Sequence, residues 1–280
     1  MKQSTRITKA KETVSIIKQG YYFAGDQKIN IHEQIQNSII NAILVRPDDF
    51  DSIQEAVANK LNTTNEQTHI SITQQRVLEA AAEMIKTRQH VGCLNFASAK
   101  NPGGGFLGGA VAQEESLALS SALYGSLIHH KEMYDYNRSQ STYLYSDHMI
   151  YSPSVPVFRD DDGELLDHPY EMSFITSPAT NVGAMRNNRP EEMAQIEETM
   201  MQRMDRMLAL FVQHGMEHLL LGAWGCGVFQ NKPDDIARYF HYYLNPLGKY
   251  GKCFKSIVFA VYDRSKDQHN IRAFEQVFAK

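Results

Sequence analysis

The sequence predicts an α/β fold with a mostly parallel or mixed central sheet. Short apolar runs of the strand type alternate along the chain with amphipathic stretches at helical spacing, which is the pattern of α/β proteins. Two of the strand-like runs lead through glycine-rich loops directly into helices, with the glycines at 103–105 and 222–227. The 280 residues, of which 42% are hydrophobic and 21% charged, are enough to build a sizeable core.

The first 88 residues are expected to form a helix-rich extension, packed on a core of residues 89–280 in one compact unit. Apolar side chains at helical spacing indicate helices before and after a hairpin-like stretch centred on Gly25. The expected elements, in chain order, are a helix over 4–19, a hairpin over 21–31, a helix or strand over 31–42, a helix capped by Asp51 or Ser52, a polar loop over 62–69 and an Ala-rich helix over 72–88.

Strand and helix signals alternate more regularly in the core. The apolar run over 91–98 suggests a strand that is covered on both faces. An acidic turn at 160–163 separates strand-like segments within 142–180. The other expected elements are a helix over 115–128, a Met-rich helix over 190–214, a strand, glycine loop and helix over 218–244, a strand over 254–263 and a helix over 271–279. The methionines at helical spacing are expected to fill the core rather than bind a cofactor.

Composition and charge argue against several classes of protein. The formal net charge of -4 does not fit a general or sequence-specific nucleic-acid binder, whose surface would be basic. The three cysteines, Cys93, Cys226 and Cys253, are far apart and suggest reduced thiols rather than disulfides or a zinc site. The chain shows no signal-peptide core and no apolar run of membrane-spanning length, so we expect it in the cytoplasm or in a compartment reached without a cleaved signal. We also expect a monomer that uses no metal and no cofactor.

The two glycine loops are candidates for binding an anionic ligand. In an open α/β sheet, ligands bind beyond the carboxyl ends of the strands, where both loops would lie. Glycine allows positive φ and close approach of the backbone, and a helix N-terminus behind each loop favours a negative charge. Neither loop has the GxGxxG spacing of dinucleotide sites or the lysine of a P-loop. Tight turns without a binding role are the alternative for either loop.

Two aromatic residues of the second loop region are expected to differ in role. Trp224, the only tryptophan, is expected to pack in the interior. Phe229 could be an ordinary core residue. Its ring could instead present a flat face to a nucleobase, a contact that contributes about 1–3 kcal/mol.

Glu114 and Glu115 open the helix that follows the first loop. A pair of acidic residues in a first helical turn is ordinarily explained by a favourable interaction with the helix dipole. The position directly after the glycine tract suggests instead glycosidic chemistry beside a phosphate-bearing sugar. Because adjacent side chains point in different directions, we expect one carboxyl to transfer the proton while the other holds the sugar hydroxyls.

These residues resemble the signature of the poly(ADP-ribose) glycohydrolases. Three glycines, seven further residues and then Gln113, Glu114 and Glu115 match its spacing, and the stretches NFASAKNPGGGFLGGAVAQEESL and GAWGCGVFQNKP are similar to the bacterial-type branch. The resemblance extends over most of the chain and includes ITKAKETVSIIKQGYY near the N-terminus. It implies a macrodomain-like three-layer α/β/α sandwich, with a mixed central sheet and an N-terminal helical extension.

The resemblance also implies an activity. The family hydrolyses the ribose–ribose O-glycosidic bonds of poly(ADP-ribose), and bacterial-type members release ADP-ribose mainly from the chain end, so ADP-ribosylated proteins would be its partners. Glu115 would match the acid/base and Glu114 the residue that binds ribose hydroxyls, with Gln113 positioning the pair. The implied substrate contacts are Asn101, Gly103, Gly104 and Gly105 around the distal ribose and diphosphate, and Gly222, Gly225, Cys226, Gly227, Val228 and Phe229 on the opposite side.

Three alternatives stay open. The same pocket could remove a single ADP-ribose from a protein side chain or a nucleic-acid end, or it could bind ADP-ribose without catalysis. A metal-dependent hydrolase would need an acidic cluster, whereas Asp160, Asp161 and Asp162 are expected to form a solvated turn before Gly163. The tyrosine that the larger animal-type enzymes place over the substrate has no identified counterpart in this sequence.

Overall fold

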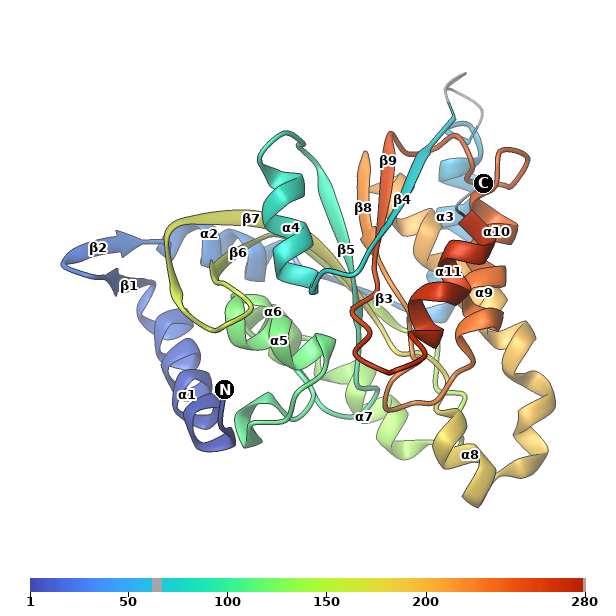
Figure 1. Cartoon of the computed structure of the whole chain (residues 1–280), viewed down its shortest axis with the longest axis horizontal. Coiled ribbons are helices and arrows are strands. Elements are labelled where there is room, and N and C mark those ends of the chain that lie inside the picture. The colour runs from blue at the N-terminus through green and yellow to red at the C-terminus, as the bar shows by residue number, and fades with distance from the viewer. Residues whose placement is uncertain (62–66, 279–280) are drawn as a thin grey trace.

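The computed structural model describes residues 1–61 and 67–278, and a seven-stranded mixed sheet runs through its centre (Figure 1). The strands in sheet order are β3 (Ile43–Val45), β6 (Met149–Arg159), β7 (Leu165–Ser177), β5 (Val91–Phe96), β8 (His218–Leu221), β9 (Ser256–Ala260) and β4 (His69–Thr73). The pairs β7–β5, β5–β8, β8–β9 and β9–β4 are parallel, whereas β3–β6 and β6–β7 are antiparallel. The predicted mixed sheet is therefore confirmed.

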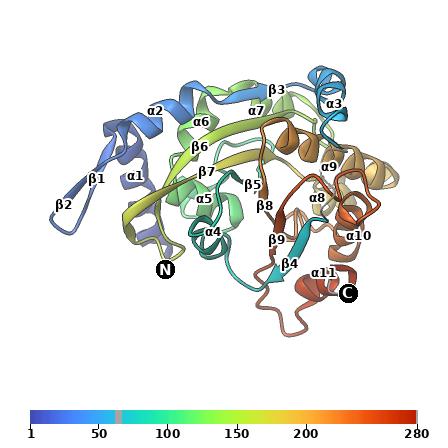
Figure 2. The ribbon, with the colours of Figure 1, turned by 90° about the horizontal axis from the view of Figure 1, so that it is seen from above.

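Helices cover both faces of the sheet (Figure 2). One hydrophobic cluster joins the sheet to α3 (Phe50–Ala58), α9 (Ile196–Gln213), α10 (Pro233–Leu244) and α11 (His269–Phe278). The other joins it to α1 (Gln3–Gln19), α2 (His32–Ile40), α4 (Val77–Ile85), α5 (Gln113–Ser120), α6 (Leu123–His129) and α7 (Lys131–Ser139). The short helix α8 (Val182–Asn188) and the 3-10 turns η1 (Pro47–Asp49), η2 (Phe106–Gly108) and η3 (Pro190–Gln195) lie between these elements in the chain. Two clusters on opposite faces of one sheet make the three layers that were expected.

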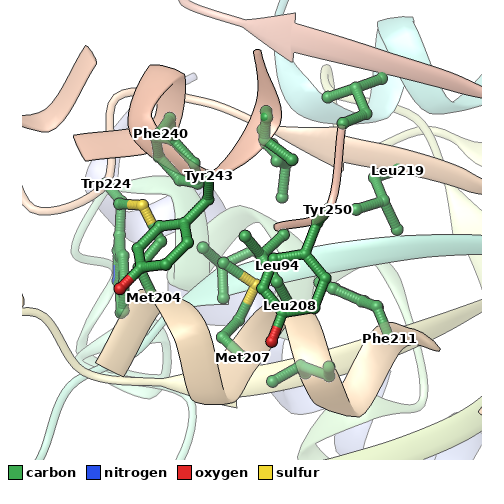
Figure 3. Close-up of a cluster of buried hydrophobic side chains, with 14 of the residues drawn as sticks. Leu94, Met204, Met207, Leu208, Phe211, Leu219, Trp224, Phe240, Tyr243 and Tyr250 are labelled. Carbon is green, nitrogen blue, oxygen red and sulfur yellow. The ribbon is translucent and has the colours of Figure 1, made fainter. Parts of the chain in front are cut away.

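The strands serve both clusters because successive side chains point to opposite faces. In β8, Leu219 and Leu221 belong to the cluster with α9, while Leu220 belongs to the cluster with α1. Figure 3 shows part of the α9 cluster, where Met204 of that helix lies beside Trp224. Met204 and Trp224 are fully buried, as predicted, and the indole N–H of Trp224 donates to the carbonyl of Ser177 at 3.2 Å.

The N-terminal part of the chain contributes strands that the sequence did not predict. The helix α1 and the hairpin of β1 (Tyr21–Ala24) and β2 (Gln27–Asn30) lie where they were expected, and the stretch 31–42 is helical over α2 rather than a strand. However, β3 and β4 are strands of the central sheet, so residues 1–88 are more than an extension packed on it. The expected helix over 72–88 begins only at Val77, because residues 69–73 pair with β9. Most of the expected polar loop over 62–69 lies outside the described residues.

The core elements match the predicted order, although two expected helices differ in extent and two further helices were not expected. The expected helix over 115–128 is interrupted at Ser121, whose extended backbone forms a bridge with Val157 of β6 before α6 begins. The expected helix over 190–214 starts as the 3-10 turn η3 and becomes α-helical at Ile196. The helices α7 and α8 were not predicted. Within residues 1–61 and 67–278, no helix combines the length and the apolar character that crossing a membrane requires.

Candidate active site

The carboxyl ends of five parallel strands meet at one edge of the sheet, and the loops that follow them enclose a cavity of about 640 Å³. This is the edge at which ligands bind in open α/β sheets. Both glycine loops, Glu114 and Glu115 line the cavity. A second, more polar hollow of about 530 Å³ adjoins it beyond Arg76 and Tyr262, but it contains neither glycine loop. The larger cavity is therefore the candidate site.

The first glycine loop passes directly over the carboxylates. Gly103 and Gly104 have φ values of +69° and +60°, which favour glycine. A Cβ on Gly104 would overlap the Oε1 of Glu115 and would lie 2.9 Å from its carboxyl carbon. The next residue, Gly105, donates its backbone N–H to the same oxygen at 2.9 Å. Glycine is therefore required here for close approach of the backbone to Glu115.

The helix α1 holds this loop from outside. Arg6 Nε donates to the carbonyl of Gly109 at 2.7 Å, and Gln3 Nε2 donates to the carbonyl of Gly108 at 3.0 Å. Gly109 has a φ of +75°, and a Cβ there would lie 2.9 Å from the carbonyl oxygen of Gln3. The N-terminal helix thus restrains the glycine-rich loop, which would otherwise be one of the more flexible parts of the chain.

Gln113 fixes the start of α5 to the end of β5. Its Oε1 accepts from the backbone N–H of Phe96 at 2.8 Å, and its Nε2 donates to the carbonyl of Leu94 at 2.8 Å. The Gln113 amide therefore makes the hydrogen bonds that a neighbouring strand would otherwise make to the Phe96 N–H and the Leu94 carbonyl. Both ends of the side chain are occupied in this way, which supports the expected positioning role rather than direct contact with a ligand.

Glu114 is almost completely buried beneath the loop. Its carboxyl accepts from the backbone N–H of Ser98 at 2.6 Å and from Asn95 Nδ2 at 3.3 Å, and it is 2% exposed. Burial raises the pKa of Glu114 to about 8, and the neighbouring charge of Glu115 acts in the same direction. The hydrogen bonds from Ser98, Asn95 and Gly103 lower this pKa but do not outweigh burial. Glu114 is therefore largely protonated at neutral pH.

Glu115 has a different environment although it is the next residue. Its side chain is half-buried, lines the cavity and accepts the N–H of Gly105. The buried Glu114 and the accessible Glu115 can therefore do different things. A proton can pass between Glu115 and a ligand in the cavity, while a neutral Glu114 can both donate to and accept from a hydroxyl group.

The second glycine loop is held by a buried amide. Gly225 has a φ of +75°, and a Cβ there would lie 2.6 Å from Asn231 Nδ2. Asn231 Nδ2 donates to the carbonyls of Thr180 and Gly225 at 2.8 and 3.2 Å, and its Oδ1 accepts from Thr180 Oγ1 at 2.9 Å. These bonds join the loop after β8 to the loop after β7. Asn231 and Thr180 were not predicted, although a polar residue closing a glycine loop is a recognisable signal.

Phe229 lines the cavity and is supported from behind by a second ring. Its centroid lies 5.9 Å from that of Tyr145, and its carbonyl accepts from the N–H of Gly183 at 3.1 Å. Val228, next to it, is 77% exposed at the cavity rim. Cys226 also lines the cavity, and burial raises the pKa of its thiol above the usual value. Phe229 is thus half-buried: it packs against the hydrophobic cluster with α9 and also lines the cavity.

The predicted site residues are brought together with two exceptions. Gly103 and Gly222 do not line the cavity; Gly103 packs against Ala118, and Gly222 packs against the backbone of Ala260. The others line it: Asn101, Gly104, Gly105, Gln113, Glu114, Glu115, Gly225, Cys226, Gly227, Val228 and Phe229. Gly103 and Gly222 instead allow close packing behind the two loops.

The other end of the cavity was missed at the sequence level. It is lined by residues that follow β4 and β9, namely Gln75, Arg76, Val77, Val261 and Tyr262. Gln75, Arg76 and Val77 fall within the stretch that was expected to be helical, and no binding role was inferred for Val261 and Tyr262 at the end of the strand expected over 254–263. The acidic turn also differs from expectation: Asp161 lines the cavity, accepts the N–H of Glu79 at 2.8 Å, and has its pKa raised to about 6 by burial. Among residues 1–61 and 67–278, no group of three or more metal-ligating side chains is assembled.

Replacing Glu114 with glutamine should change how stability depends on pH. The folded pKa of about 8 lies above the ordinary value of 4.5, so the protonated carboxyl stabilises the fold fully below about pH 4.5. That contribution is lost as the pH rises towards and through 8, because the folded protein must then hold a buried charge. Between pH 5 and 8.5, the free energy of unfolding of the wild type should therefore decrease by on the order of a few kcal/mol more than that of Glu114→Gln. Urea titrations across this range measure it, and parallel curves for the two proteins would contradict the assignment.

The comparisons with known proteins agree with this geometry. The family model for the microbial-type PARG catalytic domain, where PARG is poly(ADP-ribose) glycohydrolase, matches residues 10–160. The crystal structure of poly(ADP-ribose) glycohydrolase from Thermomonospora curvata is 40% identical, with a TM-score of 0.93 over 98% of this chain and 100% of that one. No curated protein matches this sequence.

Two ligand complexes are also similar to this chain. The T. curvata enzyme bound to the inhibitor ADP-HPD is 40% identical, with a TM-score of 0.90 over 98% of this chain and 99% of that one. The enzyme from Deinococcus radiodurans in complex with ADP-ribose is 37% identical, with a TM-score of 0.83 over 90% and 98% of the respective chains. These matches confirm the family resemblance of the sequence and the macrodomain-like α/β architecture.

Proposed function

This chain belongs to the microbial-type poly(ADP-ribose) glycohydrolase family, and from that membership we propose that it hydrolyses the ribose–ribose O-glycosidic bonds of poly(ADP-ribose) and releases ADP-ribose, mainly from the chain end. The observation that carries the proposal is the pair of unlike carboxyls under the first glycine loop. Glu115 is accessible from the cavity, whereas Glu114 is buried and has a pKa of about 8. Similar structures are complexes with ADP-ribose and with ADP-HPD.

The two carboxyls take separate parts in the proposed reaction. Glu115 gives its proton to the leaving ribose oxygen as the glycosidic bond breaks and the anomeric carbon becomes oxocarbenium-like. The Glu115 carboxylate then takes a proton from water, whose oxygen forms the new bond to that carbon. Glu114 binds ribose hydroxyls, and its neutral form avoids placing a second negative charge beside Glu115. Adjacent residues cannot flank the sugar as separated carboxylates do, which supports one acid/base residue.

The remaining walls suit the rest of an ADP-ribose unit. The backbone of Gly104 and Gly105 approaches the cavity on one side, and that of Gly225 and Gly227 approaches it on the other. Such backbone can bind a diphosphate without a basic side chain. Phe229 is suited to pack against the adenine or the proximal ribose. We infer a cytoplasmic monomer that acts on polymer-bearing proteins without a metal or cofactor.

An assay of leaving groups tests this function. The wild-type protein is incubated with poly(ADP-ribose) and, in parallel, with proteins carrying single ADP-ribose groups on serine, arginine or aspartate and with ADP-ribosylated nucleic-acid ends. Free ADP-ribose is expected from the polymer, at an unchanged rate in excess EDTA. Release only from a mono-ADP-ribosylated substrate would identify the other hydrolase activity. Tight calorimetric binding of ADP-ribose without any hydrolysis would identify a binding module instead.

A further inference from the structure

The reaction leaves part of the substrate outside the cavity. When the bond to the terminal unit breaks, the leaving oxygen belongs to the ribose of the preceding ADP-ribose unit, which carries its own adenine and a diphosphate with negative charge. The protein has a formal net charge of -4, so overall charge does not attract this polyanion. Any affinity for the preceding unit must come from local groups at the rim of the cavity.

A continuous row of contacts runs from the first glycine loop to the second, and at its two ends Asn101 and Phe229 line the cavity. Lys100 directly precedes Asn101 of the cavity wall, and its Nζ lies 5.8 Å from the centroid of the Tyr143 ring. The carbonyl of Tyr143 accepts from the N–H of Asn181 at 2.9 Å. Asn181 caps α8, whose Gly183 donates its N–H to the carbonyl of Phe229 at 3.1 Å. In Figure 1, α7 and α8 lie beside the loops at this edge of the sheet.

Two positive side chains on this row have no ionic partner among residues 1–61 and 67–278. The Lys100 ammonium lies over the Tyr143 ring, and the exposed Arg186 donates through Nη1 to Gln230 Oε1 at 3.0 Å, next to Phe229.

The charged groups nearby do not neutralise this pair. Arg138 forms an ion pair with Asp135 and donates to the carbonyl of Lys100, so it holds the Lys100 backbone in place. The acidic side chain that reaches the row, Glu192, accepts from the backbone N–H of Tyr143 at 3.0 Å. The row therefore carries two positive side chains without an ion pair among residues 1–61 and 67–278, together with the half-buried Tyr143.

We propose that Lys100, Tyr143 and Arg186 form a subsite for the ADP-ribose unit on the leaving side of the cleaved bond. Lys100 and Arg186 bind the diphosphate of that unit, and the ring of Tyr143 stacks against its adenine. The subsite rests on the proposed function, since it has a ligand only if the substrate is a polymer. It favours poly(ADP-ribose) over a single ADP-ribose on a protein, because the latter has no preceding unit.

The test compares a polymer with a substrate that lacks the preceding unit. The test variant is the double substitution Lys100→Glu/Arg186→Glu. The control is the double substitution Lys18→Glu/Lys86→Glu, which changes the net charge by the same amount at exposed positions on α1 and after α4. Each protein is assayed on poly(ADP-ribose) and on ADP-ribose joined to p-nitrophenol. Lys100→Glu/Arg186→Glu should raise KM for polymer about tenfold with little change in kcat. A change of this size is expected when exposed charged side chains lose their contacts with phosphate. Its KM for the p-nitrophenol substrate and its calorimetric Kd for ADP-ribose should stay within about twofold of wild type.

The outcomes separate this inference from the proposed function. Equal effects on both substrates, or an unchanged KM for polymer, would overturn the subsite. Failure of the wild type to release ADP-ribose from polymer would instead overturn the proposed function. Tyr143→Leu supplies a test without a charge change, and stacking on adenine predicts a rise in KM for polymer of about fivefold or more. Thermal denaturation of each variant establishes that it is folded.

Discussion

Glu115→Gln is expected to abolish the release of ADP-ribose from polymer while leaving the affinity for ADP-ribose within about threefold of wild type. The substitution keeps the shape of the side chain and an oxygen that can accept the N–H of Gly105. It removes the only proton-transferring function assigned to the cavity, so general acid and general base steps are both lost. Such catalysis contributes about 10²–10⁴-fold, and we expect the loss in kcat to be at the upper end. Single-turnover release of ADP-ribose and calorimetry measure the two quantities separately.

A matched substitution on the surface gives the control. Glu83→Gln makes the same chemical change at an exposed position on α4, and it should leave kcat and Kd unchanged. Substantial turnover by Glu115→Gln would rule out its role as the acid/base. A loss of ADP-ribose affinity as large as the loss in rate would show that Glu115 contributes to binding rather than to proton transfer.

Gly104→Ala should be nearly as damaging, although it removes no functional group. The residue has a φ of +60°, and a new Cβ would overlap the carboxyl of Glu115. Either the loop or Glu115 must move, and a displacement of about 1 Å in a catalytic group can cost on the order of 100-fold in rate. The strained backbone conformation adds a loss of stability of about 1 kcal/mol or more. Activity on polymer and urea denaturation measure the two effects.

Gly108→Ala in the same loop distinguishes this effect from a general sensitivity to substitution. Gly108 has no positive φ, and a Cβ there would meet no heavy atom within 4 Å. Its alanine variant should therefore keep near wild-type activity and stability. If both variants lose activity equally, flexibility of the whole loop would explain the result better than close approach at Gly104.

Much of the architecture could be predicted because it depends on local patterns. The alternation of apolar runs and amphipathic stretches correctly indicated β5 to β9 and the helices α9 to α11. The missed strand β4 has the alternating sequence HISIT and lies at the sheet edge, with its last four side chains only half-buried. Its pairing with β9 joins residues almost 190 positions apart, and no local signal contains that partner. The missing strand also hid the part of the cavity wall that follows it, at Gln75 and Arg76.

The sequence by itself determined the spacing between the glycines at 103–105 and the carboxyls of Glu114 and Glu115. This spacing indicated that the loop backbone and the two carboxyls lie together beyond the end of one strand. Only the tertiary structure decided which of the two glutamates is buried. Glu114 points under the loop towards Asn95 and Ser98, whereas Glu115 faces the cavity. The physical reason is that a pKa depends on the burial and the hydrogen bonds of a group, and these come from whatever the fold packs around it. The order of residues specifies the two carboxyls, but their surroundings bury Glu114, which raises its pKa, and leave Glu115 accessible from the cavity.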